Sequence, residues 1–103
     1  MKNQLLIKFE HCRNDMIKSL VAAVKESPNK KILLDENPID LRIEEDGQIH
    51  QYRYKMLSME NNTLSVYYFS GEGINPSEYE DFIDDISLFS LNEIYNIVNH
   101  IKD

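Results

Sequence analysis

Apolar and polar residues alternate along three runs in the middle third of the chain, between Ile39 and Ser70. Alternation with a period of two is typical of strands that bury one face. Asp46-Gly47 separates the first two runs, and Glu60-Asn61-Asn62 separates the last two. Residues of these types favour tight hairpin turns because Gly, Asn and Asp tolerate positive φ. The pattern therefore predicts a three-stranded antiparallel meander.

A two-residue loop at Asp46-Gly47 would fix the register of the first hairpin. Each apolar residue of the first strand then faces a ring, in the pairs Ile43–His50, Leu41–Tyr52 and Ile39–Tyr54. On the other face Asp40 lies opposite Arg53, a cross-strand charge pair worth roughly 0.2–1 kcal/mol. A slip of one residue would exchange the two faces, so this agreement favours the register.

The second turn has two possible lengths. A three-residue loop, Glu60-Asn61-Asn62, pairs Tyr54 with Tyr68 and gives one continuous apolar face. A two-residue turn at Asn61-Asn62 instead places Leu57 opposite Val66. We prefer the first because of that continuity.

With this register, one face of the sheet is the core face and the other is turned outward. The core face carries Ile39, Leu41, Ile43, Tyr52, Tyr54, Met56, Leu64, Val66 and Tyr68. The opposite face carries Arg42, Arg53, Lys55, Leu57, Tyr67 and Phe69.

Helical patterns precede and follow the meander. Residues 4–26 place apolar side chains on one side at the 3.6-residue period, and Pro28 follows the predicted helix. Residues 90–101 begin with Ser90 and Glu93 at the spacing of a capping box. The inward stripe of this second helix is expected to hold Leu91, Ile94, Tyr95, Val98 and Ile101, with Asn92, Asn96, Asn99 and His100 outside.

Two shorter segments are less regular. Residues 32–34 read as a short strand or as an apolar lead-in to the meander. In residues 71–89, Asn75 could cap a short helix with Pro76 in its first turn. An extended segment across the sheet edge is the alternative.

These elements predict an α+β, two-layer α-β-β-β-α architecture in which both helices pack on the face with Tyr52, Tyr54 and Tyr68. At 103 residues the chain is expected to form a single domain, residues 1–103.

The composition restricts the compartment and the class of protein. One cysteine excludes an internal disulfide framework. The longest apolar run, residues 20–24, is far too short for a membrane span, and Leu5-Leu6-Ile7 is too short for a signal-peptide core. We therefore expect a small cytoplasmic protein with no membrane partner.

Charge is distributed unevenly along this acidic chain. The net charge is −7, but residues 1–34 carry +4 and residues 35–103 carry −11. The acidic density peaks at Glu78, Glu80, Asp81, Asp84 and Asp85. A basic first helix resting near an acidic remainder is one interpretation, and an acidic surface for a basic partner is the other.

No group of residues in the sequence predicts a catalytic site or a metal site. Cys12 lies on the apolar stripe of the first helix, and His11 points roughly 100° away from it. None of the three histidines has a partner at i+3 or i+4, and the acidic segment lacks the spacing of a calcium loop. We expect no catalytic residues, no metal and no cofactor, and hence not an enzyme.

The face with Arg42, Arg53, Lys55, Tyr67 and Phe69 is the strongest candidate surface. Tyr, Phe and Arg are enriched in protein interfaces, so we expect a protein partner or a second copy of the chain. Cations among aromatic rings also suit single-stranded nucleic acid, although the net charge counts against it. A sheet back partly covered by residues 71–89 is the third interpretation. From the sequence we expect an interaction or regulatory module that binds its partner through this face and the acidic segment. Nucleic-acid binding through the same face is the alternative function.

Overall fold

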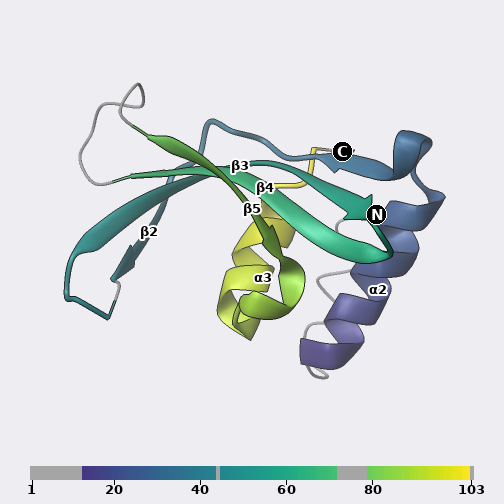
Figure 1. Cartoon of the computed structure of the whole chain (residues 1–103), viewed down its shortest axis with the longest axis horizontal. Coiled ribbons are helices and arrows are strands. Elements are labelled where there is room, and N and C mark those ends of the chain that lie inside the picture. Colours follow the sequence, from purple (N-terminus) through teal and green to yellow (C-terminus); the bar gives the residue numbers. More distant parts are fainter. Residues whose placement is uncertain (1–12, 44, 72–78, 103) are drawn as a thin grey trace.

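The computed structural model describes residues 13–43, 45–71 and 79–102, and shows an open five-stranded antiparallel sheet with both described α-helices on one side (Figure 1). The elements are α2 (Arg13–Glu26), η1 (Pro28–Lys30), β1 (Lys31–Leu33), β2 (Asp40–Ile43), β3 (Ile49–Glu60), β4 (Thr63–Gly71), β5 (Glu80–Asp85), η3 (Ile86–Leu88) and α3 (Leu91–Asn99). The predicted α+β class is confirmed.

The sheet is larger than the predicted meander. β3 pairs on one side with β1 and β2, which follow one another along its length, and on the other side with β4. β5 then pairs with β4 and forms the far edge. Residues 32–33 are thus strand, and residues 80–85 take the extended alternative rather than the helical one. The proposed cap at Asn75 lies outside the described residues.

The register predicted for β2 on β3 is wrong by one residue. Asp40 lies opposite Tyr52 instead of Arg53, and Arg42 lies opposite His50. The cause is the turn, which is longer than the two residues assumed: Gly47 has φ 81°, and the Asp46 carboxylate accepts a hydrogen bond from the Gln48 N–H at 2.9 Å. Strand side chains alternate, so this single step exchanges the faces of β2.

The exchange reverses the burial expected for the first strand. Leu41 and Ile43 were expected in the core but are 66% and 78% exposed, and Ile39 is 40% exposed. Arg42 was expected on the outward face but lies on the inner side, with only 14% of its side chain exposed.

The preferred three-residue loop of the second hairpin is wrong, because Glu60 pairs with Thr63 and leaves the two-residue turn. The pair that it predicted, Tyr54 with Tyr68, nevertheless forms because β3 contains a bulge. Asn61 and Asn62 have φ of 49° and 65°, as a two-residue type I′ turn requires, and Leu57 lies opposite Val66. The register shifts between Tyr54 and Met56, so that Tyr54 still lies opposite Tyr68. One extra residue in β3 therefore keeps both pairs on the inner face. Met56 was predicted inside but pairs with Tyr67 on the outer face, and Leu57 was predicted outside but is fully buried.

The core lies between the inner face of the sheet and the two helices. α2 contributes Met16, Leu20 and Val24 at helical spacing. The sheet and the C-terminal part contribute Ile32, Leu34, Tyr54, Leu57, Leu64, Val66, Tyr68, Ile86, Phe89, Ile94, Ile97, Val98 and Ile101. The remainder of the first predicted helix, residues 4–12, including His11 and Cys12, lies outside the described residues.

α3 begins with the predicted capping box. The Ser90 hydroxyl accepts a hydrogen bond from the Glu93 N–H at 3.2 Å, and the Glu93 carboxylate accepts one from the Ser90 N–H at 2.8 Å. The inward stripe differs from the prediction, because Tyr95 is 41% exposed whereas His100 is 6% exposed. Ile94, Ile97 and Val98 form the buried row of α3, with the spacing of one helix face, and Ile101 is buried beyond the end of the helix.

The exchanged faces give opposite expectations for two leucines. Leu57→Ala should lower the free energy of unfolding by about 2–5 kcal/mol, because it opens a cavity in the core. Leu41→Ala should change it by less than about 0.5 kcal/mol, because Leu41 is on the surface. Urea unfolding of the two variants measures both values. A larger loss for Leu41→Ala than for Leu57→Ala would contradict the described register.

Candidate functional site

We define the outer face of the sheet as the side turned away from α2 and α3 (Figure 1). It combines aliphatic, aromatic and cationic side chains. Strand alternation and the bulge assign to it Leu33, Leu41, Ile43, Ile49, Arg53, Lys55, Met56, Tyr67, Phe69 and Ile83. Of the predicted interaction residues, the structure brings together Arg53, Lys55, Tyr67 and Phe69 here, and excludes Arg42 and Leu57.

Aliphatic side chains are the most exposed part of the outer face. Leu41 and Ile43 on β2 are joined by Ile49, 57% exposed, on the adjacent end of β3. Ile83 on β5 and Leu33 on β1 are exposed by 56% and 61%. Exposed apolar side chains that lie together on one surface commonly mark an interaction site.

One cation of this face, Lys55, already has partners within it. The Lys55 ammonium lies 4.1 Å above the ring of Phe69 and 3.7 Å from the Asp81 carboxylate of β5. Lys55, Phe69, Tyr67 and Arg53 are only half-exposed. The rings predicted as stacking surfaces are thus partly covered by their own neighbours.

Arg42 forms the polar centre of the inner face instead. Its guanidinium donates to the Glu93 carboxylate of α3 and to the Tyr54 hydroxyl of β3. It also lies 4.3 Å from the centroid of the Tyr52 ring. These contacts tie β2 to the first turn of α3 through a charge that is largely removed from water.

A second link joins the start of β2 to the end of α3. His100 Nε2 lies 3.6 Å from an Asp40 carboxylate oxygen, and His100 Nδ1–H donates to the Asn96 carbonyl. Burial raises the pKa of the Asp40 carboxyl above 3.8, although His100 and Arg42 both act to lower it. Asp40, Arg42 and His100 were not predicted to meet, because their contact depends on the register of β2.

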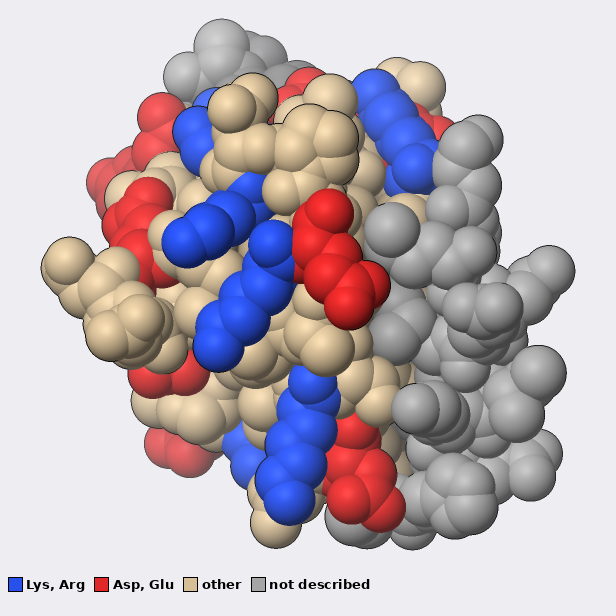
Figure 2. Space-filling model, turned by 90° about the vertical axis from the view of Figure 1, so that its right-hand side faces the viewer, with Lys and Arg blue, Asp and Glu red and all other residues tan. Residues whose placement is uncertain are grey.

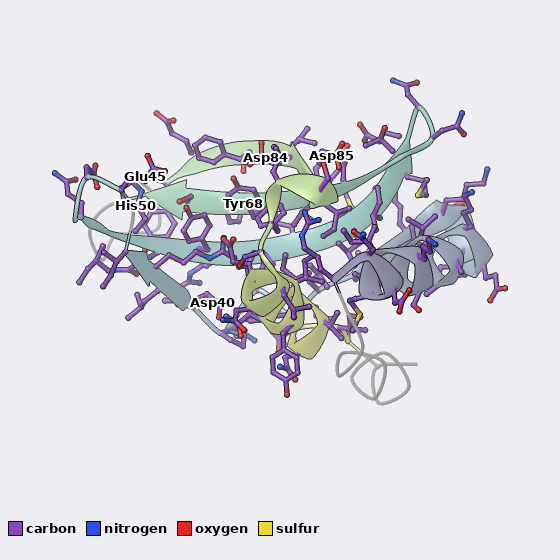
Figure 3. All side chains as sticks on the ribbon, turned by 90° about the horizontal axis from the view of Figure 1, so that it is seen from below. Asp40, Glu45, His50, Tyr68, Asp84 and Asp85 are labelled. Carbon is purple, nitrogen blue, oxygen red and sulfur yellow. The ribbon has the colours of Figure 1, made fainter. Side chains whose placement is uncertain are left out.

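Beyond α3 the inner face is open and lined with rings. An open hollow of about 510 Å³ is lined by Glu45, Asp46, His50, Tyr52, Tyr68, Ser70 and Phe82. Figure 3 shows His50 and Glu45 at one end of the sheet and Tyr68 nearer its middle. Tyr68 stacks on Phe82 with ring centroids 5.4 Å apart and donates its hydroxyl hydrogen bond to Asp84. Burial, together with that hydrogen bond, raises the pKa of Tyr68 above 10.0.

The predicted acidic surface does not form a single cluster. Asp84 accepts from Tyr68 on the inner side, whereas Asp81 approaches Lys55 on the outer side. Asp85 accepts from the Ser87 N–H at 2.8 Å and so caps η3. Glu80 is exposed at the start of β5, and Glu78 lies outside the described residues. In residues 13–43, 45–71 and 79–102, no three His, Cys, Asp or Glu side chains come together as a metal-binding group.

Basic side chains gather at the end of the molecule where α2 and η1 lie (Figure 2). The exposed lysines there are Lys18, Lys25, Lys30 and Lys31. Arg13 does not pair with a carboxylate in the described contacts but donates to the carbonyls of Ser87 and Phe89, which holds α2 against η3.

The exposed residues Leu41, Ile43, Ile49 and Ile83 were not among the predicted interaction residues. A loop longer than Asp46-Gly47 is the one signal that could have identified Leu41 and Ile43. With such a loop, the same alternation places Leu41 and Ile43 on the outer face.

Comparison of the chain with models of known families, with curated proteins and with solved structures gave no match. Among the described residues, no helix combines the length and the apolar character needed to cross a membrane.

The Arg42–Glu93 pair should show a measurable coupling energy. In a double-mutant cycle of Arg42→Met and Glu93→Gln, we expect a coupling of about 1–2 kcal/mol in the free energy of unfolding, because each single change leaves a part-buried polar partner. Gln at position 93 preserves the capping box, so the cycle isolates the charge contact.

Ser90→Ala is the matched control for the Arg42–Glu93 cycle. It should cost about 1 kcal/mol whether or not Arg42 is present, because it removes only the cap. Additive costs for Arg42→Met and Glu93→Gln would contradict the contact.

Tyr68 should remain un-ionised at pH values where an exposed tyrosine has lost half its protons. Because its folded pKa is raised, the stabilisation from the neutral phenol is complete below pH 10.0 and is lost as pH rises through the folded value. The tyrosinate absorbance of the wild-type protein minus that of Tyr68→Phe should stay near zero through pH 10 and rise only above it. A difference curve that is half complete at pH 10 would show that Tyr68 is not held in this way.

Proposed function

We propose that this chain is a small non-enzymatic interaction or regulatory module, which binds another protein or a second copy of itself through the outer face of its sheet. The observation that supports the proposal best is the group of exposed aliphatic side chains on that face, above all Leu41, Ile43 and Ile49. Burying one such side chain is worth roughly 1.5–3 kcal/mol, so a few of them would provide most of a moderate affinity.

The composition of the surrounding surface suits a protein partner. Tyr67, Phe69 and Arg53 share this face with the aliphatic group, and these residue types are enriched where proteins meet. Asp81 and Asp85 lie on the outer side of β5, so the acidic segment provides one border of the face. A partner with an apolar centre and basic residues at its rim would complement both parts.

Nucleic acid fits this surface less well than protein does. The Lys55 ammonium is shared between the Phe69 ring and the Asp81 carboxylate, and the whole chain carries −7. A phosphate backbone would have to compete with that carboxylate.

The proposal predicts that retention of a partner depends on the outer face. Tagged wild-type protein, an Ile43→Ser/Ile49→Ser double variant and a Leu88→Ser control should be used to capture proteins from native lysate, with quantitative mass spectrometry. We expect the double variant to retain about tenfold less of the specific partner, which corresponds to about 1.4 kcal/mol of binding free energy. Leu88 is 72% exposed but belongs to η3, so Leu88→Ser should retain as much as the wild type.

Two results would contradict this function. Equal recovery with all three proteins would show that the outer face does not bind. Nucleic-acid binding would be supported instead by two results together. Nuclease treatment would abolish retention of the partner, and Arg53→Ala/Tyr67→Ala would abolish a salt-sensitive mobility shift of nucleic acid.

A further inference from the structure

Within the described part of the chain, β2 leaves one edge of its backbone open. It pairs with β3 on one side, and no described residue pairs with its other side. The neighbouring strand β1 is different, because the C-terminal residues run along it: Leu34 forms a bridge with Ile101, and the Lys102 N–H donates to the Leu33 carbonyl at 3.2 Å. An open strand edge is a template for pairing with another chain.

The inner side of the open edge of β2 also adjoins an unfilled space. An open hollow of about 430 Å³ lies between β2 and α3, lined by Arg42, Ile43, Glu45, Asn92, Glu93 and Asn96. Figure 3 shows β2 at the border of the sheet, with Asp40 at its end nearer α3.

We propose that β2 pairs antiparallel with β2 of a second copy, about a two-fold axis at Leu41, so that two sheets join into one. This inference rests on the proposed function and names its partner as a second copy of this chain. The axis places Leu41 opposite Leu41 of the partner subunit, Asp40 opposite the partner's Arg42, and Ile39 opposite the partner's Ile43. The apolar pairs on the outer face are favourable. On the inner face each carboxylate lies opposite a guanidinium that stays on Glu93 and Tyr54 of its own chain, so no like charges face each other.

The sequence of β2 selects this register over its neighbours. A two-fold axis at Asp40 would place two carboxylates opposite each other, and an axis at Arg42 would place two guanidinium groups opposite each other. An axis between two residues would place the apolar face of one strand against the charged face of the other, because the side-chain period is two. Of the axes that pair Asp40, Leu41 and Arg42 with residues 39–43 of the second copy, only the axis at Leu41 avoids all three conflicts. Such self-complementarity is what a two-fold interface requires.

The opposite edge of the sheet is unsuited to the same role. β5 carries Glu80, Asp81, Asp84 and Asp85 within six residues. Two such strands side by side would bring like charges together, and charged side chains of this kind are a usual means of preventing edge pairing. The sheet therefore has one edge that repels a second copy and one that accepts it.

The pairing can be tested by replacing the residue at the axis. Leu41→Lys and Leu41→Glu each place two like charges opposite each other, whereas an equimolar mixture of the two variants places Lys opposite Glu. Ile83→Lys is the control, because Ile83 lies on the same face and is 56% exposed, against 66% for Leu41, but belongs to β5. Sedimentation equilibrium over a range of concentrations should give the mass of each sample.

The expected results distinguish the β2 edge from any other contact. The wild type and Ile83→Lys should reach the mass of two chains at the same concentration. Each Leu41 variant alone should need at least about tenfold more protein, and the mixture should recover most of that loss. Circular dichroism should show folded protein in every case, because Leu41 and Ile83 are surface positions.

Three outcomes would overturn the proposal: a wild type with the mass of one chain at every concentration, dimers of Leu41→Lys as tight as those of the wild type, or dissociation by Ile83→Lys. A monomeric wild type whose lysate partner is still lost in Ile43→Ser/Ile49→Ser would overturn this pairing alone and leave the proposed function standing. A monomeric wild type with no loss in that double variant would overturn both.

Discussion

The inward position of the Arg42 guanidinium determines how the rest of this structure is arranged. It lies between the Glu93 carboxylate, the Tyr54 hydroxyl and the face of the Tyr52 ring, so a charge on β2 is held within the layer between sheet and helix. A charge in such a place must be paired, because an unpaired one would cost several kcal/mol. Since strand side chains alternate, an inward Arg42 requires Leu41 and Ile43 to point outward. The contact of Arg42 with Glu93 and Tyr54 therefore places Leu41 and Ile43 on the outer face.

The same contact couples local structure to packing. Glu93 has two roles: one carboxylate oxygen completes the capping box of α3, and the other receives Arg42. At the far end of α3, His100 approaches Asp40, so β2 is joined to both ends of the helix. This arrangement fixes β2 along one border of the sheet, although the strand is short and has a hydrogen-bonded neighbour on only one side among the described residues. Its outer side chains are thereby held in place from the inner side by contacts with α3.

The sequence predicted some features well, and the reasons are physical. The capping box at Ser90 and Glu93 depends on residues three apart, so local chemistry was enough to identify it. The turn at Asn61-Asn62 was also recognisable from its residue types. The bulge at Lys55 was not, because its position depends on which side chains of β3 pack against the helices. The first hairpin failed for a similar reason: the Asp46-Gly47 signal gives the place of a turn but not its length. A single residue of uncertainty there was enough to move Arg42 to the wrong face and to hide Leu41 and Ile43, whereas Leu57 was misplaced by the bulge.

The register of β2 on β3 is the claim on which the outer face and the open edge both depend, and cross-strand nuclear Overhauser contacts in the folded protein measure it most directly. Backbone protons of opposite residues in an antiparallel pair are close, so the spectrum identifies each partner. With the register described above, we expect contacts that join Asp40 to Tyr52 and Arg42 to His50. Contacts that join Asp40 to Arg53 and Leu41 to Tyr52 would contradict it, because they would place Leu41 and Ile43 inside.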